Sequence, residues 1–308
     1  MRAGDLYLNN IMTKELKEKL KLLADKYEVS SFCDEDPSQF LRWYQPEKGR
    51  GSLADVEAAS FIASMLAFGN RKQFIPKIRE ILETSERSLG SVSEWLKAGA
   101  YKKDFGHGAA KFYRFYSYDD MQIFFEELAE ILKQAETMGE YFRGEAGGVM
   151  RSHTFTTEFE SSRLLSNSRG IDRGFRGGAP RRRGSGRPRS GLERGEGLPL
   201  LIAEAFPKSA IVPKGKSSAN KRVHMFLRWM VRRNSPVDLG LWTWADPAEL
   251  LIPLDVHVMQ EAAKLGLIGE KATASRKTAE LLTAALCEVF PGDPCRGDYA
   301  LFGLGVDK

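Results

Sequence analysis

The chain has 308 residues, of which 42% are hydrophobic and 28% charged, a composition typical of a globular protein with one or two domains. No apolar run approaches the roughly 18 residues of a membrane span, and the charged N-terminal stretch has no signal-peptide pattern, so we expect a cytoplasmic protein. Cys33, Cys287 and Cys295 are too few and too scattered for a disulfide framework or a metal site, and neither a metal nor a cofactor is expected.

The net charge of +5 is concentrated in one segment. Residues 151–195 hold eleven arginines, no lysine and four acids, so they carry +7 and leave about −2 on the rest of the chain. The overall charge therefore says little about the folded part. The arginine-rich segment either adds non-specific affinity for DNA or RNA or is a tolerated insertion.

The first half of the chain follows a helical pattern. A helix is predicted over about 13–28, and after a turn-rich passage the small and apolar residues of DVEAASFIASMLAFG predict a buried helix from about residue 53. Further helices are predicted in KQFIPKIREILET, over 91–97 and over 119–135, with a polar and aromatic connection over 101–118.

The second half begins with a change of composition. The helical pattern is lost over about 144–197, and residues 166–197 have almost no large apolar side chains. They cannot bury enough surface to offset their ordering entropy, so a disordered Arg/Gly-rich insertion is predicted over 144–197. Helices then follow in KRVHMFLRWMVRR, from PLDVH and over about 274–289, before a loop ending in DYALFGLG. No segment alternates convincingly at period two, so the predicted fold class is all-α.

We expect two helical lobes with a central cleft between them. One lobe would join residues 1–50 to residues 236–308, and the other would join residues 51–143 to residues 198–235.

Two stretches carry candidate chemistry. In VPKGKSSANKRVHMFLRW (212–229), small residues form a tight connection just before a helix opens at Asn220 and Lys221. A helix N-terminus exposes unpaired N–H groups and partial positive charge, which suits a phosphate. In PLDVH, Asp255 stands at the N-cap of the next helix. The cations that would reinforce the phosphate site are Lys214, Lys216, Lys221 and Arg222.

The order of these stretches resembles the helix-hairpin-helix/Gly-Pro-Asp DNA glycosylase superfamily, which includes endonuclease III and the archaeal 8-oxoguanine glycosylases. Within it, the strings KR-x-x-MFLRWMVR, PLD-x-HV and D-x-ALFGLG resemble a bacterial family of uncharacterised proteins. The resemblance covers roughly residues 50–145 and 198–305. It implies a helix-hairpin-helix DNA glycosylase-like fold, with double-stranded DNA carrying a damaged or abasic site as partner, and we expect a monomer.

The resemblance also implies site residues. The superfamily's Gly-x-Gly-x-Lys hairpin corresponds to Ser217, Ser218, Ala219, Asn220 and Lys221, so the lysine is kept and both glycines are replaced. Its Val-Asp-Thr-His-Val corresponds to residues 254–258, with Asp255 as the aspartate, 34 positions after Lys221. The four-cysteine cluster of endonuclease III is absent. The segment whose tip enters the duplex corresponds to MLAFGNRKQ, which makes Asn70, Arg71, Lys72 and Gln73 candidates to face DNA.

The residue types suit the implied chemistry. A deprotonated lysine amine can attack the anomeric carbon of a nucleotide rotated out of the stack, and burial and neighbouring cations such as Arg222 favour deprotonation. The resulting Schiff base permits strand cleavage. Asp255 would deprotonate Lys221 and stabilise the oxocarbenium-like charge.

Each assignment has a structural alternative. Asp255 could be only an N-cap and Lys221 only a first-turn residue, although a cation at a helix N-terminus is locally disfavoured. His257 could pack near the helix start. The aromatic and basic residues Lys111, Tyr113, Arg114 and Tyr116 could stack bases, or pack in the core and at its rim. Trp242 and Trp244 could wall a base pocket, or close the core between the two halves.

We therefore predict a DNA-repair N-glycosylase acting on a damaged, for example oxidised purine, base, with abasic-site lyase activity through Lys221 and Asp255. The remaining DNA contacts would come from Lys216, Arg222 and the hairpin residues 217–220. The alternatives are a non-catalytic DNA-binding protein of the same fold, for which the missing hairpin glycines argue, and an RNA-directed member.

Overall fold

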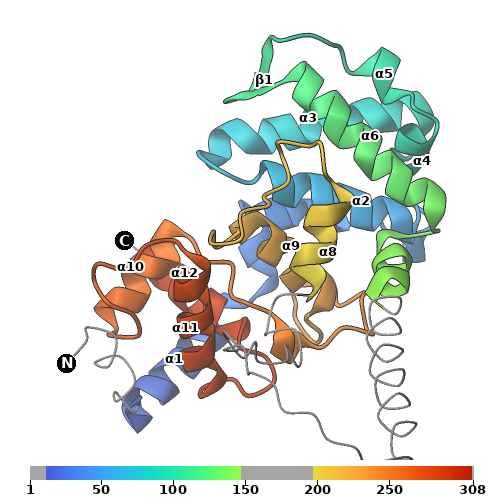
Figure 1. Cartoon of the computed structure of the whole chain (residues 1–308). Helices are drawn as coiled ribbons and strands as arrows, with labels where there is room; N and C mark the ends of the chain where they lie inside the picture. The colour runs from blue at the N-terminus through green and yellow to red at the C-terminus, as the bar shows by residue number, and fades with distance from the viewer. Residues whose placement is uncertain (1–11, 147–196, 307–308) are drawn as a thin grey trace, which may run out of the picture.

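The computed structural model describes residues 12–146 and 197–306, and this part of the chain is mostly helical (Figure 1), in agreement with the predicted all-α class. Its named strands are β1 (Lys111–Tyr113) and β2 (Tyr116–Ser117), an antiparallel hairpin in the connection that the sequence left without regular structure. None of the helices in the described ranges is long and apolar enough to cross a bilayer. Of the predicted insertion, residues 147–196 lie outside the described residues.

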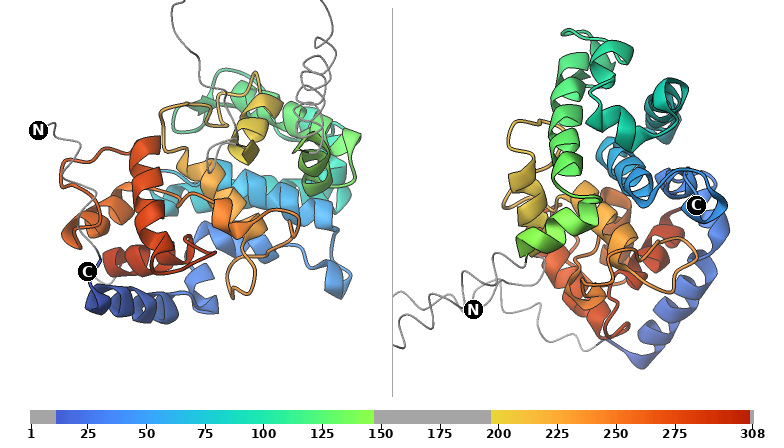
Figure 2. Two further views of the ribbon diagram at one scale, coloured as in Figure 1. Left: turned by 60° about the horizontal axis from the view of Figure 1, so that its bottom comes forward. Right: turned by 90° about the vertical axis from the view of Figure 1, so that its right-hand side faces the viewer.

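Two hydrophobic clusters define two lobes. The central lobe takes its core from side chains between Phe40 and Phe142 and between Ile202 and Leu250. The terminal lobe takes its core from α1 (Lys14–Tyr27) and from side chains between Ile252 and Leu301. The described segments nearest to both chain ends therefore lie in one lobe, and Figure 2 shows α1 against the C-terminal helices.

The lobe boundaries differ from the predicted ones at two places. Phe40, Leu41 and Tyr44 belong to the core of the central lobe, because the short 3₁₀ helix that carries the first two packs on α2. Trp242 and Leu250 belong to that core as well. Residues 36–50 and 236–250 thus contribute to the central lobe, since their large apolar side chains complete its core rather than that of the terminal lobe.

The central lobe is organised around α2 (Leu53–Leu66), which is buried on nearly every side. A capping box fixes its start: the Ser52 hydroxyl accepts from the Asp55 N–H, and the Asp55 carboxylate accepts from the Ser52 N–H. The other helices of the lobe are α3 (Arg71–Leu89), α4 (Val92–Lys97), α5 (Tyr101–Asp104), α6 (Tyr118–Gln134), α8 (Gly197–Ala205) and α9 (Lys221–Val231), and residues 138–146 are helical too.

The terminal lobe contains α12 (Arg296–Val306), where a loop was predicted. That prediction was wrong because the glycines of this stretch do not mark turns. A Cβ on Gly297 would lie 2.5 Å from Leu286 Cδ2, and a Cβ on Gly303 would lie 2.1 Å from the Tyr27 ring. The glycines therefore let α12 approach its neighbours closely. The remaining helices of this lobe are α10 (Val256–Lys264) and α11 (Arg276–Cys287).

Candidate active site at the junction of the lobes

Lys221 and Asp255 meet where two helices begin. Lys221 is the first residue of α9 in the central lobe, and Asp255 is the N-cap of α10 in the terminal lobe. Lys221 Nζ donates to Asp255 Oδ2 over 2.8 Å, and Asp255 Oδ1 accepts from the Val258 N–H over 2.9 Å. The same carboxylate is therefore both helix cap and ion-pair partner, two roles that the sequence left as alternatives.

The surroundings of Asp255 keep it ionised. Burial by itself raises the pKa of this carboxyl group, but the charge and hydrogen bond of Lys221, the Val258 N–H and the charge of His257 outweigh burial and leave the pKa below its ordinary value. His257 is exposed, two residues beyond Asp255. The lysine side chain is 34% exposed and the aspartate side chain 16%, so solvent reaches the pair from the lysine side.

The loop before α9 is a tight turn that leaves the helix N-terminus without a side-chain cap. Asn220 takes a left-handed conformation with φ 41°, which asparagine tolerates better than most residues, and its side-chain amide donates to the Gly215 carbonyl over 2.9 Å. Within the described residues, no backbone acceptor takes the N–H groups of Lys221 and Arg222. These groups can receive an anion.

The same loop is attached to the terminal lobe. The Ser217 carbonyl accepts from the Arg276 N–H over 2.9 Å, and Ser218 forms a β-bridge with Ser275. Ala219 is buried in the core of the terminal lobe, which corrects its prediction as a DNA-facing residue. Lys216, Ser217 and Ser218 are exposed.

Two predicted phosphate-binding cations have internal partners instead. Arg222 donates to the Met65 carbonyl and to the Tyr116 hydroxyl, and its guanidinium lies 4.8 Å from the centre of the Phe68 ring. Lys214 Nζ donates to three backbone carbonyls between residues 206 and 209. Both side chains hold the central lobe together, and their role as cations of a phosphate site stays a prediction.

The start of α3 lies at the edge of the central lobe. Asn70 caps this helix by accepting from the Lys72 N–H over 2.9 Å. Arg71 pairs with Asp36 at 3.7 Å and lies 5.2 Å from the ring centre of Phe302 in the terminal lobe. Asn70, Lys72 and Gln73 are exposed.

The hairpin of β1 and β2 presents an aromatic side chain that the sequence analysis missed. Tyr113 and Tyr116 are buried, as the packing alternative expected, but Phe115 is 58% exposed at the turn, next to Arg114 in a left-handed conformation. The Phe115 ring contacts the rings of Phe68 and Tyr116.

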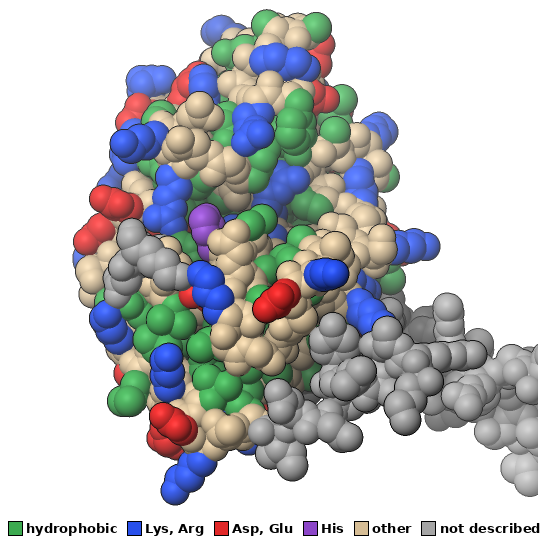
Figure 3. Space-filling model, turned by 90° about the vertical axis from the view of Figure 1, so that its left-hand side faces the viewer, with side chains coloured by type: hydrophobic (Ala, Val, Ile, Leu, Met, Phe, Trp, Pro, Cys, Tyr) green, Lys and Arg blue, Asp and Glu red, His purple; other side chains and the backbone are tan. Residues whose placement is uncertain are grey.

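In Figure 3, Lys and Arg side chains predominate over Asp and Glu on a hollowed face of the molecule.

Trp242 and Trp244 do not line a pocket at Lys221. Trp242 is 1% exposed, donates from its indole to Glu57 Oε1 over 2.8 Å and stacks on Trp244. Its backbone N–H bonds to Met230, nine residues beyond Lys221 on α9, which is about 13 Å along the helix. The prediction of a tryptophan-walled base pocket is corrected, and the alternative of core packing holds.

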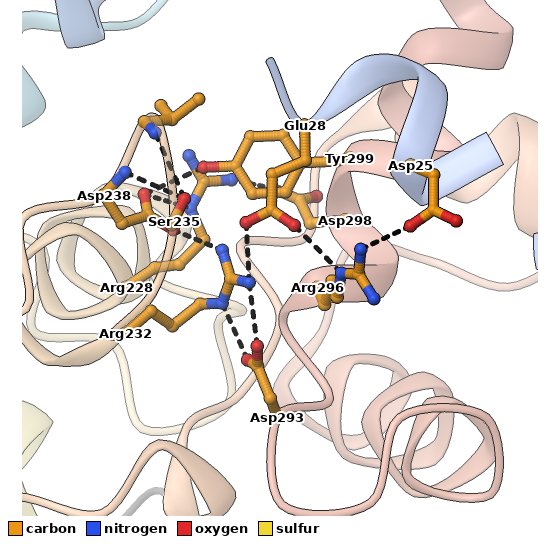
Figure 4. A network of polar contacts seen from close by, with 11 residues as sticks. Asp25, Glu28, Arg228, Arg232, Ser235, Asp238, Asp293, Arg296, Asp298 and Tyr299 are labelled. Carbon is orange, nitrogen blue, oxygen red and sulfur yellow. Dashed lines mark hydrogen bonds and ion pairs between the residues drawn. The ribbon is translucent and has the colours of Figure 1, made fainter. Parts of the chain in front are cut away.

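A buried polar network joins the lobes beside this site (Figure 4). Arg232, the C-cap of α9, donates bidentately to Asp293 over 2.7 and 2.8 Å, and also to Glu28 and Asp238. Arg228 of α9 pairs with Asp238 and with Asp298 of α12. The sequence analysis missed these residues, although arginines inside the apolar run MFLRWMVRR predict buried cations that need partners.

The outer end of the network borders a cavity of about 720 Å³ lined by charged groups that already pair with one another, among them Arg232, Asp293 and Arg296. In residues 12–146 and 197–306, no three His, Cys, Asp or Glu side chains converge to hold a metal ion.

Comparison with known proteins shows a family but no characterised relative. A search of curated proteins found no match, and a search of solved structures found none either. A family model described as a protein of unknown function, DUF2400, matches residues 36–182 and 197–307. These segments include Lys221, Asp255 and the described α-helices of both lobes except α1. Since they make up most of its length, the chain belongs to the DUF2400 family.

Proposed function

We propose that this protein is a DNA-repair N-glycosylase with abasic-site lyase activity, built on a helix-hairpin-helix glycosylase-like fold. The observation that carries the proposal is the 2.8 Å hydrogen bond between Lys221 Nζ and Asp255 Oδ2. The two lie 34 positions apart along the chain, and each begins a helix in a different lobe. A nucleophile within hydrogen-bond reach of its base is the arrangement that covalent catalysis needs.

In the proposed reaction, Lys221 transfers a proton to Asp255 and the neutral amine attacks C1′ of the flipped nucleotide. The bond from C1′ to the base breaks, and the base leaves with the bonding electrons. Opening of the sugar ring then gives a Schiff base, from which elimination of the 3′ phosphate cuts the strand. The Asp255 carboxylate is held at both oxygens, so it is oriented before the substrate arrives.

Binding of the DNA backbone is supported by the uncapped start of α9, with Lys216, Ser217 and Ser218 exposed beside it. Phe115, at the exposed turn of the hairpin, is of a kind that inserts between base steps and kinks a duplex. Asn70, Lys72 and Gln73 offer further polar contacts from the start of α3.

Borohydride trapping tests the proposal. The full chain is incubated with duplexes that carry an abasic site or 8-oxoguanine, and borohydride reduces any Schiff base to a stable amine visible as a shifted band. We expect an adduct with the wild type and none with Lys221→Gln. Lys277→Gln is the matched control, because Lys277 is an exposed lysine in the first turn of α11, and it should keep the adduct. An adduct that survives Lys221→Gln refutes the mechanism.

Two substitutions separate the roles of Asp255. Asp255→Asn keeps a good helix cap but removes the charge, whereas Asp255→Ala removes both. We expect both variants to lose adduct formation on a damaged base, and the alanine variant to lose about 1 kcal/mol more stability in urea unfolding. Equal stability of the two variants would argue against the capping role.

A second candidate is a non-catalytic DNA-binding protein of the same fold. It is favoured by the replacement of both hairpin glycines and by the use of the Ser217 carbonyl and Ala219 side chain in contacts with the terminal lobe. This protein would bind duplex DNA in a gel-shift assay and give no borohydride adduct with any lesion. Stronger retention on structured RNA than on duplex DNA would indicate the RNA-directed alternative.

A further inference from the structure

Asp298 is a buried residue, and one of its carboxyl oxygens has no hydrogen-bond partner among the described residues. It lies in the first turn of α12 and is 5% exposed. Its Oδ2 accepts from Arg228 Nη1 of α9, whereas its Oδ1 is buried with no hydrogen-bond partner among the described residues (Figure 4). A carboxylate with an unsatisfied oxygen away from water is costly, so the residue needs an explanation beyond its ion pair.

The position of Asp298 relates it to the Lys221–Asp255 pair. Lys221 and Arg228 are seven residues apart on α9, and therefore lie on the same side of this helix, two turns from each other. Helix α12, which carries Asp298, packs on α10, whose N-cap is Asp255. The charges of both Asp255 and Lys221 act on the Asp298 carboxyl group.

The charged and titratable groups near Asp298 come from every element that packs where the two lobes meet. Arg228 is its hydrogen-bonded neighbour, and carboxyl groups outnumber cations in the surrounding network. The charged and titratable groups where the lobes meet are Lys221 and Arg228 of α9, its C-cap Arg232, Asp238 from the loop after it, Asp255 and His257 at the start of α10, Glu261 within α10, Asp293 before α12, Arg296 and Tyr299 in its first turn, Asp25 and Tyr27 in the last turn of α1 and its C-cap Glu28.

The protonation of Asp298 follows from this environment. Its pKa is raised to about 6, with burial as the largest cause; the charges of Asp255 and Asp238 also raise it, whereas the charges of Arg228 and Lys221 lower it. An ionised Asp298 is therefore repelled by the Asp255 carboxylate, and protonation of Asp255 would remove this repulsion.

We propose that Asp298 is a positioning residue of the Lys221–Asp255 site, whose ionised form drives the proton of Lys221 onto Asp255. The proton moves from Nζ to Oδ2 along the existing 2.8 Å hydrogen bond, which yields a neutral amine and a neutral carboxyl group. The transfer relieves the repulsion between the Asp255 and Asp298 charges. This inference rests on the proposed function for its catalytic meaning, but the coupling between the two aspartates exists without a substrate.

The first test is the pH dependence of single-turnover borohydride trapping on an abasic duplex between pH 5 and pH 8. In the wild type, we expect the rate of adduct formation to rise through a midpoint near pH 6. Asp298→Asn should remove this midpoint and slow the reaction about tenfold at pH 7.5, the effect of one pKa unit. Asp293→Asn removes a different network carboxylate and should keep the midpoint. A midpoint that persists in Asp298→Asn overturns the proposal.

The second test needs no activity. With ¹³C-labelled aspartate, the carboxyl signal of Asp255 in the wild type should show a step at the pH where the Asp298 signal titrates, and this step should be absent in Asp298→Asn. If the chemical shift of the Asp255 carboxyl carbon does not change as Asp298 titrates, the coupling is refuted even if adducts form. If the step is present and no adduct forms at any pH, the coupling stands and the proposed function fails. The wild-type titration also decides the matter if Asp298→Asn does not fold.

Discussion

Single carboxylates connect segments that are far apart in this chain. Glu57 of α2 accepts from the Gly139 N–H over 2.9 Å and from the Trp242 indole over 2.8 Å, and is 3% exposed. Glu127 of α6 accepts in the same way from two backbone N–H groups at residues 208 and 209. The chain on both sides of residues 147–196 is thus fixed to the central lobe by buried acids.

Glu57 should make stability depend on pH. Burial raises its pKa from 4.5 to about 7, against the opposing hydrogen bonds from Gly139 and Trp242. The folded chain therefore binds this proton more tightly than the unfolded chain, so the stability it contributes is complete below about pH 4.5 and is lost as pH rises through 7. We expect the difference in unfolding free energy between the wild type and Glu57→Gln to fall by about 2–3 kcal/mol from pH 5 to pH 8.

Urea unfolding of both proteins at the two pH values measures this difference. A difference that stays constant with pH would show that Glu57 remains ionised in the folded chain throughout.

At the scale of the element, α12 shows how glycine can serve packing within a helix. Gly303→Ala would gain about 1 kcal/mol in helix propensity, but its Cβ would overlap the Tyr27 ring of α1. Because overpacking costs about 1–3 kcal/mol, and this overlap is severe, we expect a net loss of stability.

Gly305→Ala is the matched control for this substitution. It lies in the same helix, and its Cβ would make an ordinary 3.6 Å contact with His257 Cβ. Thermal unfolding should give a lower Tm for Gly303→Ala and an unchanged or higher Tm for Gly305→Ala. Equal values for the two variants would mean that α1 and α12 can separate without cost.

How far the sequence predicts an element depends on how local its signals are. The start of α10 was predicted from Asp255, because a helix cap is a local interaction. The buried helix at α2 was predicted from its run of small and apolar residues. In contrast, α12 was predicted to be a loop. A glycine is needed at position 303 because the helix packs closely on Tyr27, a residue far away in the sequence.

The site shows the same limit. A family pattern placed Lys221 and Asp255 together, and the distance between them is that of a hydrogen bond. Neither spacing nor composition could reveal that Arg222 turns back toward the Met65 carbonyl. The partners of Arg232 come from three segments that only tertiary packing brings together.

At the scale of the whole molecule, α9 joins the lobes through a row of cations. Lys221 and Arg228 of α9 and its C-cap Arg232 follow the i, i+7, i+11 spacing of one helix face, and each of them pairs with a carboxylate of the terminal lobe. Removing one cation from such a junction leaves buried acids without a partner. Arg232→Met should therefore lower the free energy of unfolding by about 3–5 kcal/mol.

A surface pair gives the comparison for Arg232. Lys133 and Glu130 form an ion pair in which both side chains are about half exposed, so Lys133→Met should change stability by less than about 1 kcal/mol. Urea unfolding measures both variants. A small effect at Arg232 would mean that water enters the junction and solvates the acids left behind.

The pairing of α1 with α12 also sets the order in which this protein can be assembled during synthesis. Helix α1 leaves the ribosome before the other described helices, and α12, on which it packs, leaves after them. The core of the central lobe ends at Leu250, apart from Cys295, so this lobe can begin to fold while α12 is still untranslated. Until then, Leu20 and Ala24 have no surface to cover them. Helix α1 is thus a segment that a chaperone would have to shield until α12 has been made.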